Sequence, residues 1–260
     1  MPSCACSMTG NETMERMFEA RGLSKRFDSR TALDHVDLAI EGPGIIGLLG
    51  RNGCGKTTLL RQITGILKPD SGAVRFKGKP INKKKVWDIV NMGIAGTFQN
   101  MRPFRRLPII ANVMVSCLSP RAMKRGEWVK RIEAKAMDAL EFAGISDMAL
   151  EKASTLSQGD LKRLEVARAI ATEPELLLLD EPLGALDRNL RERLLEELPT
   201  ILRNVDVTAI TVTHDQEEAM SIADIIAVMN NGRLEDVGPP ARVYMKPRTR
   251  FTATFMGESN

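Results

Sequence analysis

The sequence predicts an α/β protein organised around a mainly parallel β-sheet. Two observations support this fold class. Short apolar segments with the length of buried strands alternate with helical segments along the chain. One of these apolar segments also runs directly into a glycine-rich loop that is followed by a helical pattern. The expected buried strands are residues 44–49, 175–179, 207–213 and 225–229, and the expected helices between them are residues 56–67, 189–204 and 215–223.

The outer parts of the fold are assigned from side-chain periodicity. Residues 18–27 and 31–40 alternate apolar and polar side chains, as half-buried strands do. From about 103 to 171 the pattern is mainly helical, so we expect a helical lobe inserted into the core. Residues 1–16 are expected to form a disordered tail, and residues 17–260 to form the folded domain.

Composition narrows the class of protein. The 260 residues carry a net charge of +4 and are 43% apolar, which suits a globular core and gives no indication of nucleic-acid binding. No apolar stretch approaches the roughly 20 residues of a membrane-spanning helix, and the N-terminus lacks the apolar core of a secretory signal. The four cysteines match neither a disulfide framework nor a zinc site. We therefore expect a cytosolic protein.

The glycine-rich loop at residues 50–57 has the spacing of a phosphate-binding loop, G-x-x-x-x-G-K-[ST]. Glycines allow backbone N–H groups to surround phosphate oxygens, and the following helix directs its positive N-terminal end at them. Lys56 is expected to reach the β- and γ-phosphates, and the Thr57 hydroxyl to bind Mg²⁺. The loop therefore predicts binding of ATP with Mg²⁺. The expected nucleotide contacts in this segment are Gly50, Arg51, Asn52, Gly53, Cys54, Gly55, Lys56, Thr57 and Thr58.

Two further groups of residues point to hydrolysis of that ATP. The buried strand at 176–179 ends in two carboxylates, of which Asp180 is placed to hold Mg²⁺ and Glu181 to polarise the attacking water. Ser157 and Gly159 stand just before a helical pattern, where a helix N-terminus can bind an anion. In isolation Ser157 also fits an ordinary N-cap. Its position some 20 residues before the acidic strand end distinguishes it.

With these residues in view, the chain resembles the ABC ATPases from about Met17 to Asn260. The phosphate loop resembles Walker A, residues 176–181 resemble Walker B, and Leu156–Asp160 resemble the family signature. Further matches are Gln99 to the Q-loop glutamine, Asp187 to the D-loop, His214 to the switch histidine and Phe27 to the aromatic residue beside adenine. The resemblance implies a P-loop NTPase core with a mainly parallel sheet, an antiparallel β subdomain and a helical lobe.

The resemblance also implies roles and partners. Two ATPase subunits, identical or different, would dimerise head to tail, so that Ser157 and Gly159 contact the γ-phosphate held by the partner subunit. Gln99 would sense the γ-phosphate and Mg²⁺ and link the helical lobe to a membrane permease. His214 would hold the γ-phosphate and order Glu181 and the water. The implied catalytic residues are Glu181, His214, Lys56 and Gln99, and the implied Mg²⁺ ligands are Thr57, Gln99 and Asp180.

Three residues depart from the family pattern. Gln158 and Asp160 replace a glycine and a glutamine of the usual signature, and the charge of Asp160 near the γ-phosphate is expected to slow closure without abolishing activity. Cys54 stands where alanine or serine is more common. We expect a thiol reagent to block turnover at Cys54 and ATP to protect against it.

A single ATPase domain without a membrane span resembles an importer subunit. Such a subunit would lie on the inner face of the cell membrane, bound to separate transmembrane permeases, with a solute-binding protein as an indirect partner and no nucleic acid. The competing class is a soluble ABC ATPase of translation or DNA repair. Those proteins usually have two cassettes or a long coiled-coil insertion, and the sequence shows neither.

The solute is suggested differently by the two halves of the chain. Residues 93–104 and the signature resemble ATPases of branched-chain amino acid or urea importers, which favours an amino acid or urea-like solute. The segments 214–219, 237–240 and 255–260 resemble ATPases of polyamine, iron, sulfate and sugar importers, which leaves a polyamine, iron, an anion or a sugar as the alternative. Those proteins continue into a regulatory β-barrel where this chain ends, so we expect none here.

Overall fold

A computed structural model describes residues 16–97, 103–123, 129–184, 188–204 and 207–257. Its strands are β1 (Phe18–Phe27), β2 (Arg30–Ile40), β3 (Ile45–Leu49), β4 (Ser71–Phe76), β5 (Lys79–Pro80), β6 (Ile94–Thr97), β7 (Leu176–Asp180), β8 (Thr208–Thr213), β9 (Ile225–Asn230) and β10 (Arg233–Gly238). Its helices are α1 (Lys56–Ile63), α2 (Val86–Met92), α3 (Ile109–Cys117), α4 (Val129–Phe142), the 3₁₀ helix η1 (Ser146–Met148), α5 (Gln158–Ile170), α6 (Arg188–Asn204), α7 (Gln216–Ile222), α8 (Pro240–Met245) and α9 (Arg250–Gly257). None of the described helices has the length and apolar character needed to cross a membrane.

The larger sheet has the predicted mainly parallel arrangement. Its strands follow the order β10-β9-β3-β8-β7-β6, and every neighbouring pair is parallel except β10 with β9. The register pairs Leu49 with Thr213 and Asp180 with Val212. The carboxyl ends of β3, β7 and β8 therefore lie at one edge of the sheet, which is where ligands bind in such sheets. The phosphate loop, Glu181 and His214 follow these three strand ends directly.

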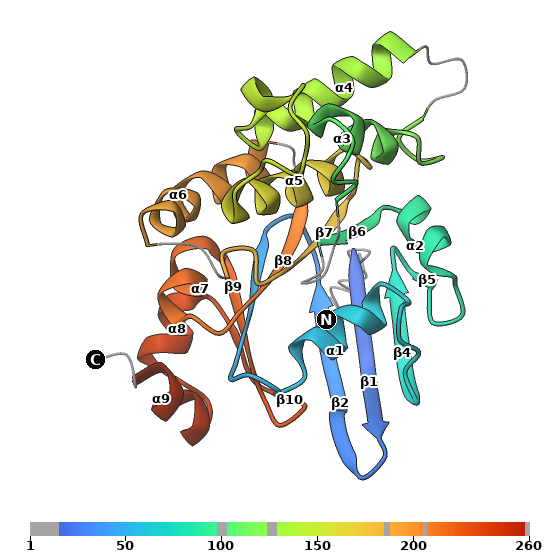
Figure 1. Cartoon of the computed structure of the whole chain (residues 1–260). Coiled ribbons are helices and arrows are strands. Elements are labelled where there is room, and N and C mark those ends of the chain that lie inside the picture. The colour runs from blue at the N-terminus through green and yellow to red at the C-terminus, as the bar shows by residue number, and fades with distance from the viewer. Residues whose placement is uncertain (1–15, 98–102, 124–128, 185–187, 205–206, 258–260) are drawn as a thin grey trace, which may run out of the picture.

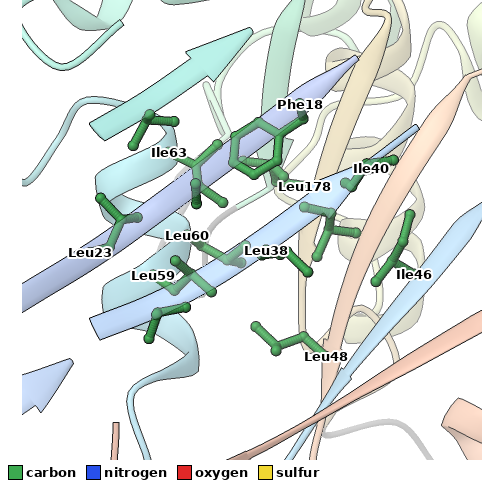
Figure 2. Packing of buried hydrophobic residues seen from close by; sticks show 14 of the residues in the cluster. Phe18, Leu23, Leu38, Ile40, Ile46, Leu48, Leu59, Leu60, Ile63 and Leu178 are labelled. Carbon is green, nitrogen blue, oxygen red and sulfur yellow. The ribbon is translucent and has the colours of Figure 1, made fainter. Parts of the chain in front are cut away.

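A second, antiparallel sheet with the strand order β2-β1-β4-β5 lies beside the parallel sheet (Figure 1). The two sheets share an apolar core to which helix α1 contributes. Leu59, Leu60 and Ile63 of α1 are buried in one cluster with Phe18 of β1 and Leu178 of β7, as Figure 2 shows. Burial of such side chains is the main stabilising term in folding. Because this core fixes α1, it also fixes the phosphate loop that immediately precedes the helix.

Helices α3, α4 and α5 have an apolar core of their own with η1. Figure 1 shows α3 and α4 at the end of the molecule opposite α9. Arg121, which follows α3, joins this helical part to the segment before β7: its Nε donates to the Glu173 carbonyl at 2.6 Å, and its Nη2 lies 2.9 Å from Glu175 Oε1. The boundaries of the lobe as a domain, about 103–171, stay a prediction.

Several elements differ from the prediction for local reasons. Helix α1 ends at Ile63 rather than at residue 67, since Gly65 adopts a φ of 74°, a left-handed conformation that ends helices. Helix α5 begins at Gln158, before Gly159 rather than after it as expected, because Ser157 caps it. Strand β6 was not predicted: it has four residues, one of them Gly96, and is too short to show a period. The predicted disordered tail lies outside the described residues, apart from Arg16.

Candidate nucleotide site

A cavity of about 430 Å³ lies where the phosphate loop meets the β1–β2 turn and the end of β7. Its walls combine backbone of the loop, one aromatic ring and charged groups of both signs. With the exception of Arg30 and Ala32, every lining residue was predicted as part of the site from the sequence. The lining residues are Phe27, Arg30, Ala32, Asn52, Gly53, Gly55, Lys56, Thr57, Thr58 and Glu181.

Two glycines of the loop are required by the close approach of neighbouring strands. A Cβ on Gly50 would lie 2.3 Å from the Met229 carbonyl oxygen of β9. A Cβ on Gly55, which has a φ of 117°, would lie 2.5 Å from the Ala32 carbonyl oxygen of β2. Neither position accepts a side chain without a backbone shift. Strands β9 and β2 therefore hold the loop in the conformation that forms the cavity wall.

Lys56 carries a buried positive charge into this cavity. Its side chain is only 5% exposed, and its Nζ donates to the carbonyl oxygens of Gly50 at 2.5 Å and Arg51 at 3.1 Å. Both acceptors are neutral, and the described part of the chain places no carboxylate within ion-pair distance of Nζ. A buried ammonium is stabilised strongly by an anionic oxygen. The lysine is therefore suited to a phosphate group bound in the loop.

Thr57 and Asp180 place two oxygen atoms side by side next to the cavity. Thr57 Oγ1 lies 3.5 Å from Asp180 Oδ1. Burial raises the pKa of the Asp180 carboxyl, and the charge of the adjacent Glu181 raises it further, while the Thr57 hydroxyl and the basic side chains nearby oppose the shift. A buried carboxylate beside a hydroxyl is a donor set that suits a hard divalent cation. These two residues therefore fit the predicted Mg²⁺ site.

Glu181 and His214 meet across the ends of β7 and β8. His214 Nδ1 lies 3.3 Å from Glu181 Oε1. The Glu181 backbone is tied to β8, because its N–H donates to the Val212 carbonyl at 3.0 Å. Glu181 also has a φ of 49°, a left-handed conformation that is unfavourable for a residue with a side chain and is common at functional sites. The turn brings the Glu181 side chain to the cavity wall, where it is placed to polarise a water molecule.

Ser157, Gly159 and Asp160 begin helix α5, and none of them lines the cavity. The Ser157 hydroxyl donates to Asp160 Oδ2 at 2.6 Å, and its oxygen accepts from the Asp160 N–H at 3.2 Å. Ser157 is thus an N-cap in this chain, the ordinary interpretation that the sequence left open. The proposed contact of Ser157 and Gly159 with phosphate would have to be made to another subunit.

Phe27 and Arg30 form the β1–β2 side of the cavity. Phe27 is 47% exposed and lines the cavity, and Lys25 Nζ lies over its ring at 5.6 Å from the centroid, so a nucleotide base could stack only on the part of the ring that Lys25 leaves open. Arg30 Nη2 donates to the Gly53 carbonyl at 2.9 Å, which ties the β-hairpin to the phosphate loop. Sequence reasoning missed Arg30 and Ala32. Arg30 belongs to no sequence motif, and only the tertiary structure places it beside the phosphate loop.

Cys54 does not have the surroundings of a reactive thiol. Its side chain is 6% exposed and belongs to the apolar core, with Sγ positioned 2.8 Å from where a Cβ of Gly50 would lie. Burial raises the pKa of the thiol above its ordinary value of 9.0, although the charge of Lys56 opposes the shift. The thiolate is the reactive form. The block of turnover by a thiol reagent stays a prediction, and the burial of the thiol adds that its reaction should be slow.

The remaining predicted residues are distributed around the cavity or fall outside the described chain. Gly50, Arg51, Asp180 and His214 contact lining residues through the bonds given above without lining the cavity themselves. Gln99 and Asp187 lie outside the described residues.

A model of the ABC transporter family matches residues 33–184, which is more than half of the chain. The chain belongs to this family. The match spans the phosphate loop, the signature segment and the acidic strand end, so the protein is an ABC ATPase.

Curated relatives share most of this cassette. The chain is 43% identical over 242 residues to sulfate/thiosulfate import ATP-binding protein CysA 2 of Chromobacterium violaceum, a match that covers 92% of this chain and 63% of that protein. It is 39% identical over 243 residues to sulfate/thiosulfate import ATP-binding protein CysA of Pseudomonas aeruginosa, covering 93% of this chain and 72% of that protein. This chain therefore spans roughly two thirds of the length of these relatives.

Solved cassettes confirm the fold class. An ATP-binding cassette of an ABC transporter in its ADP conformation is 26% identical, with a TM-score of 0.79 over 92% of this chain and 98% of that one. The protein cbiO1 from Clostridium perfringens, part of the ABC transporter complex cbiONQ, is 28% identical with a TM-score of 0.79 over 89% and 92% of the two chains.

Replacing Gly50 by alanine should weaken ATP binding at least about tenfold, a loss of about 1.4 kcal/mol. The added Cβ overlaps the Met229 carbonyl and forces the loop to move. Titration with a fluorescent ATP analogue measures the effect. Gly42→Ala is the matched control, since its Cβ would meet no atom within 4 Å. A folded Gly50→Ala variant that binds ATP as tightly as the control would contradict the assignment of residues 50–57 as the phosphate-binding loop.

Alkylation of Cys54 by iodoacetamide should be slow at about pH 7 and should accelerate about tenfold per pH unit up to at least about pH 9. The reason is that a raised pKa keeps the thiol protonated across this range. Mass spectrometry of the peptide that contains Cys54 gives the rate, with glutathione in the same tube as the reference thiol. A rate equal to that of glutathione at about pH 7 would show that the side chain is accessible and reactive.

Proposed function

We propose that the protein is the ATP-hydrolysing subunit of an importer for sulfate or a chemically related anion, and that it works with separate membrane permeases. The observation that carries the proposal is similarity along the whole cassette. Eight curated relatives, 38 to 43% identical over 92 to 93% of this chain, are each described as sulfate/thiosulfate import ATP-binding proteins.

This proposal replaces the amino acid or urea-like solute favoured by residues 93–104 and the signature. Residues 93–104 and the signature lie around the nucleotide-binding motifs, and the chemistry of ATP hydrolysis there is the same for every solute. The segments at 214–219, 237–240 and 255–260 instead led to the alternative that includes an anion, and the full-length similarity supports that alternative. Import through permeases on the cytoplasmic face, with a solute-binding protein upstream, belongs to the same proposal.

The residues of the cavity support a division of tasks during hydrolysis. Backbone of the phosphate loop and Lys56 hold the β- and γ-phosphates of ATP, and Phe27 stacks on the base. Thr57 and Asp180 would hold Mg²⁺, which neutralises charge on the phosphates when bound. Glu181 polarises the attacking water, and His214 orients the Glu181 carboxylate through the 3.3 Å contact. Gln99 keeps its proposed role in sensing the γ-phosphate and Mg²⁺, and Asp187 keeps its proposed place among the nucleotide-binding residues.

A second ATPase subunit completes the site in this proposal. Ser157 and Gly159 do not line the cavity of their own chain, so they are free to meet the γ-phosphate held by a partner subunit. To do so, the Ser157 hydroxyl must exchange its bond to Asp160 for a bond to phosphate. That exchange and the charge of Asp160 both favour slow closure of the dimer.

Replacing Glu181 by glutamine should lower kcat for ATP hydrolysis at least about a hundredfold, because the amide cannot act as the base. Binding of ATP should stay within about twofold of the parent, and light scattering should show an ATP-dependent dimer that persists. Glu196→Gln removes an exposed carboxylate of α6 and is the matched control. Normal hydrolysis by the Glu181→Gln variant would remove this residue from the mechanism.

The solute is tested in the organism that encodes the chain. Replacing Lys56 by alanine in the chromosomal gene should lower uptake of radiolabelled sulfate at least about tenfold, since the loss of the phosphate-binding charge stops ATP turnover. Uptake of radiolabelled leucine and of urea should be unchanged. Loss of leucine or urea uptake with normal sulfate uptake would restore the first interpretation and overturn the anion proposal.

A further inference from the structure

The turn that carries His214 is fixed by one hydroxyl group. Thr213, the last residue of β8, donates from Oγ1 to Glu218 Oε2 at 2.6 Å. The same oxygen accepts from the Asp215 backbone N–H at 3.0 Å. His214 lies between Thr213 and Asp215 in the chain, so the Thr213 hydroxyl holds both of its neighbours.

Glu218 is an unusual anchor for such a turn. Its side chain is 4% exposed, and its second carboxylate oxygen, Oε1, has no hydrogen-bond partner within the described residues. Burial raises the pKa of this carboxyl, and the charge of Asp215 raises it further, while the Thr213 hydroxyl and the charges of Arg191 and His214 oppose the shift. A half-satisfied buried carboxyl is destabilising by itself. Stability alone therefore does not account for glutamate at this position.

The rest of the network links the start of α7 to α6. Asp215 Oδ1 accepts from the Glu218 N–H at 3.2 Å, which caps α7, and Asp215 Oδ2 lies 3.3 Å from Nη1 of Arg191. These bonds fix the residue after His214 in two directions. Together with the Thr213 hydroxyl, they leave the backbone of the turn little freedom.

Glu181 depends on the same stretch of β8. Its N–H donates to the carbonyl of Val212, and its side chain meets the ring of His214 two residues later. Residues 212–215 therefore hold both partners of the Glu181–His214 contact. A rotation of this turn would separate Oε1 of Glu181 from Nδ1 of His214.

We propose that Glu218, acting through the Thr213 hydroxyl, is a positioning residue that holds the His214 ring against Glu181. The inference rests on the proposed function, in which these two residues act on ATP. It adds that hydrolysis depends on a buried pair that touches neither nucleotide nor water. The competing possibility is a brace that only stabilises α7.

The test uses Thr213→Val, which removes the hydroxyl and keeps the shape of the side chain. We expect kcat for ATP hydrolysis to fall about ten- to a hundredfold with KM within about twofold, since a displaced catalytic group costs turnover rather than binding. Thr213→Ser should restore most of the turnover. Thr208→Val is the matched control: it lies on the same strand, is equally buried, and its hydroxyl has no partner within the described residues. Glu218→Gln and the melting temperature of each variant accompany these measurements.

The same substitution in a His214→Ala protein distinguishes positioning of the His214 ring from simple stabilisation of α7. In a His214→Ala protein, Thr213→Val should lower kcat by less than about twofold, because the ring it positions is gone. An equal fall in both backgrounds, or an unchanged kcat for Thr213→Val in the parent, would overturn the inference while leaving the proposed function intact. Full hydrolysis by His214→Ala alone would instead remove the histidine from the proposed mechanism, and the inference would fall with it.

Discussion

Helix α1 holds the nucleotide site in place because it is buried in the core that the two sheets share. Leu59, Leu60 and Ile63 lie in one apolar cluster with residues of β1 and β7 (Figure 2), and the phosphate loop immediately precedes the helix in the chain. The backbones of β9 and β2 leave no space for a Cβ at Gly50 or Gly55. These strands and the core therefore restrict the loop to the conformation that forms the cavity wall. A restricted loop loses little conformational freedom on binding, so more of the phosphate contact energy appears as affinity.

Parallel strand register explains why much of the site could be predicted from sequence. Thr57 and Asp180 are 123 positions apart and Glu181 and His214 are 33 apart, yet each pair meets because β3, β7 and β8 end at one edge. Residue types and spacing identified Thr57, Asp180 and Glu181, and the family resemblance added His214. Arg30 could not be found this way, because its bond to Gly53 arises from packing of the β-hairpin on the loop. The burial of the Cys54 side chain could not be predicted from the sequence either, because a motif defines the spacing of residues and not the direction of each side chain.

The solute could not be derived from the motifs for a different physical reason. Residues that contact phosphate and water have the same chemical role for every transported solute, so the sequence around them carries little information on solute specificity. Similarity over the full cassette includes the surfaces that meet other subunits as well as the nucleotide site. That is why 38 to 43% identity along the chain outweighs the local resemblance of residues 93–104.

The ends of β7 and β8 concentrate features that oppose folding. Asp180 is a buried carboxyl beside Glu181, Glu181 itself has a φ of 49°, and Glu218 keeps one oxygen without a partner within the described residues. Lys56 places an ammonium in the same region with only neutral acceptors. Bound phosphate would compensate the charge of Lys56, and a divalent cation would compensate the carboxyl of Asp180, whereas Glu218 does not line the cavity and would gain no partner from either. Ligand binding and folding stability are then linked, since a ligand that binds the folded state alone stabilises it. The apolar core around α1 offsets this strain, which allows the strand ends to keep the arrangement that the proposed reaction requires.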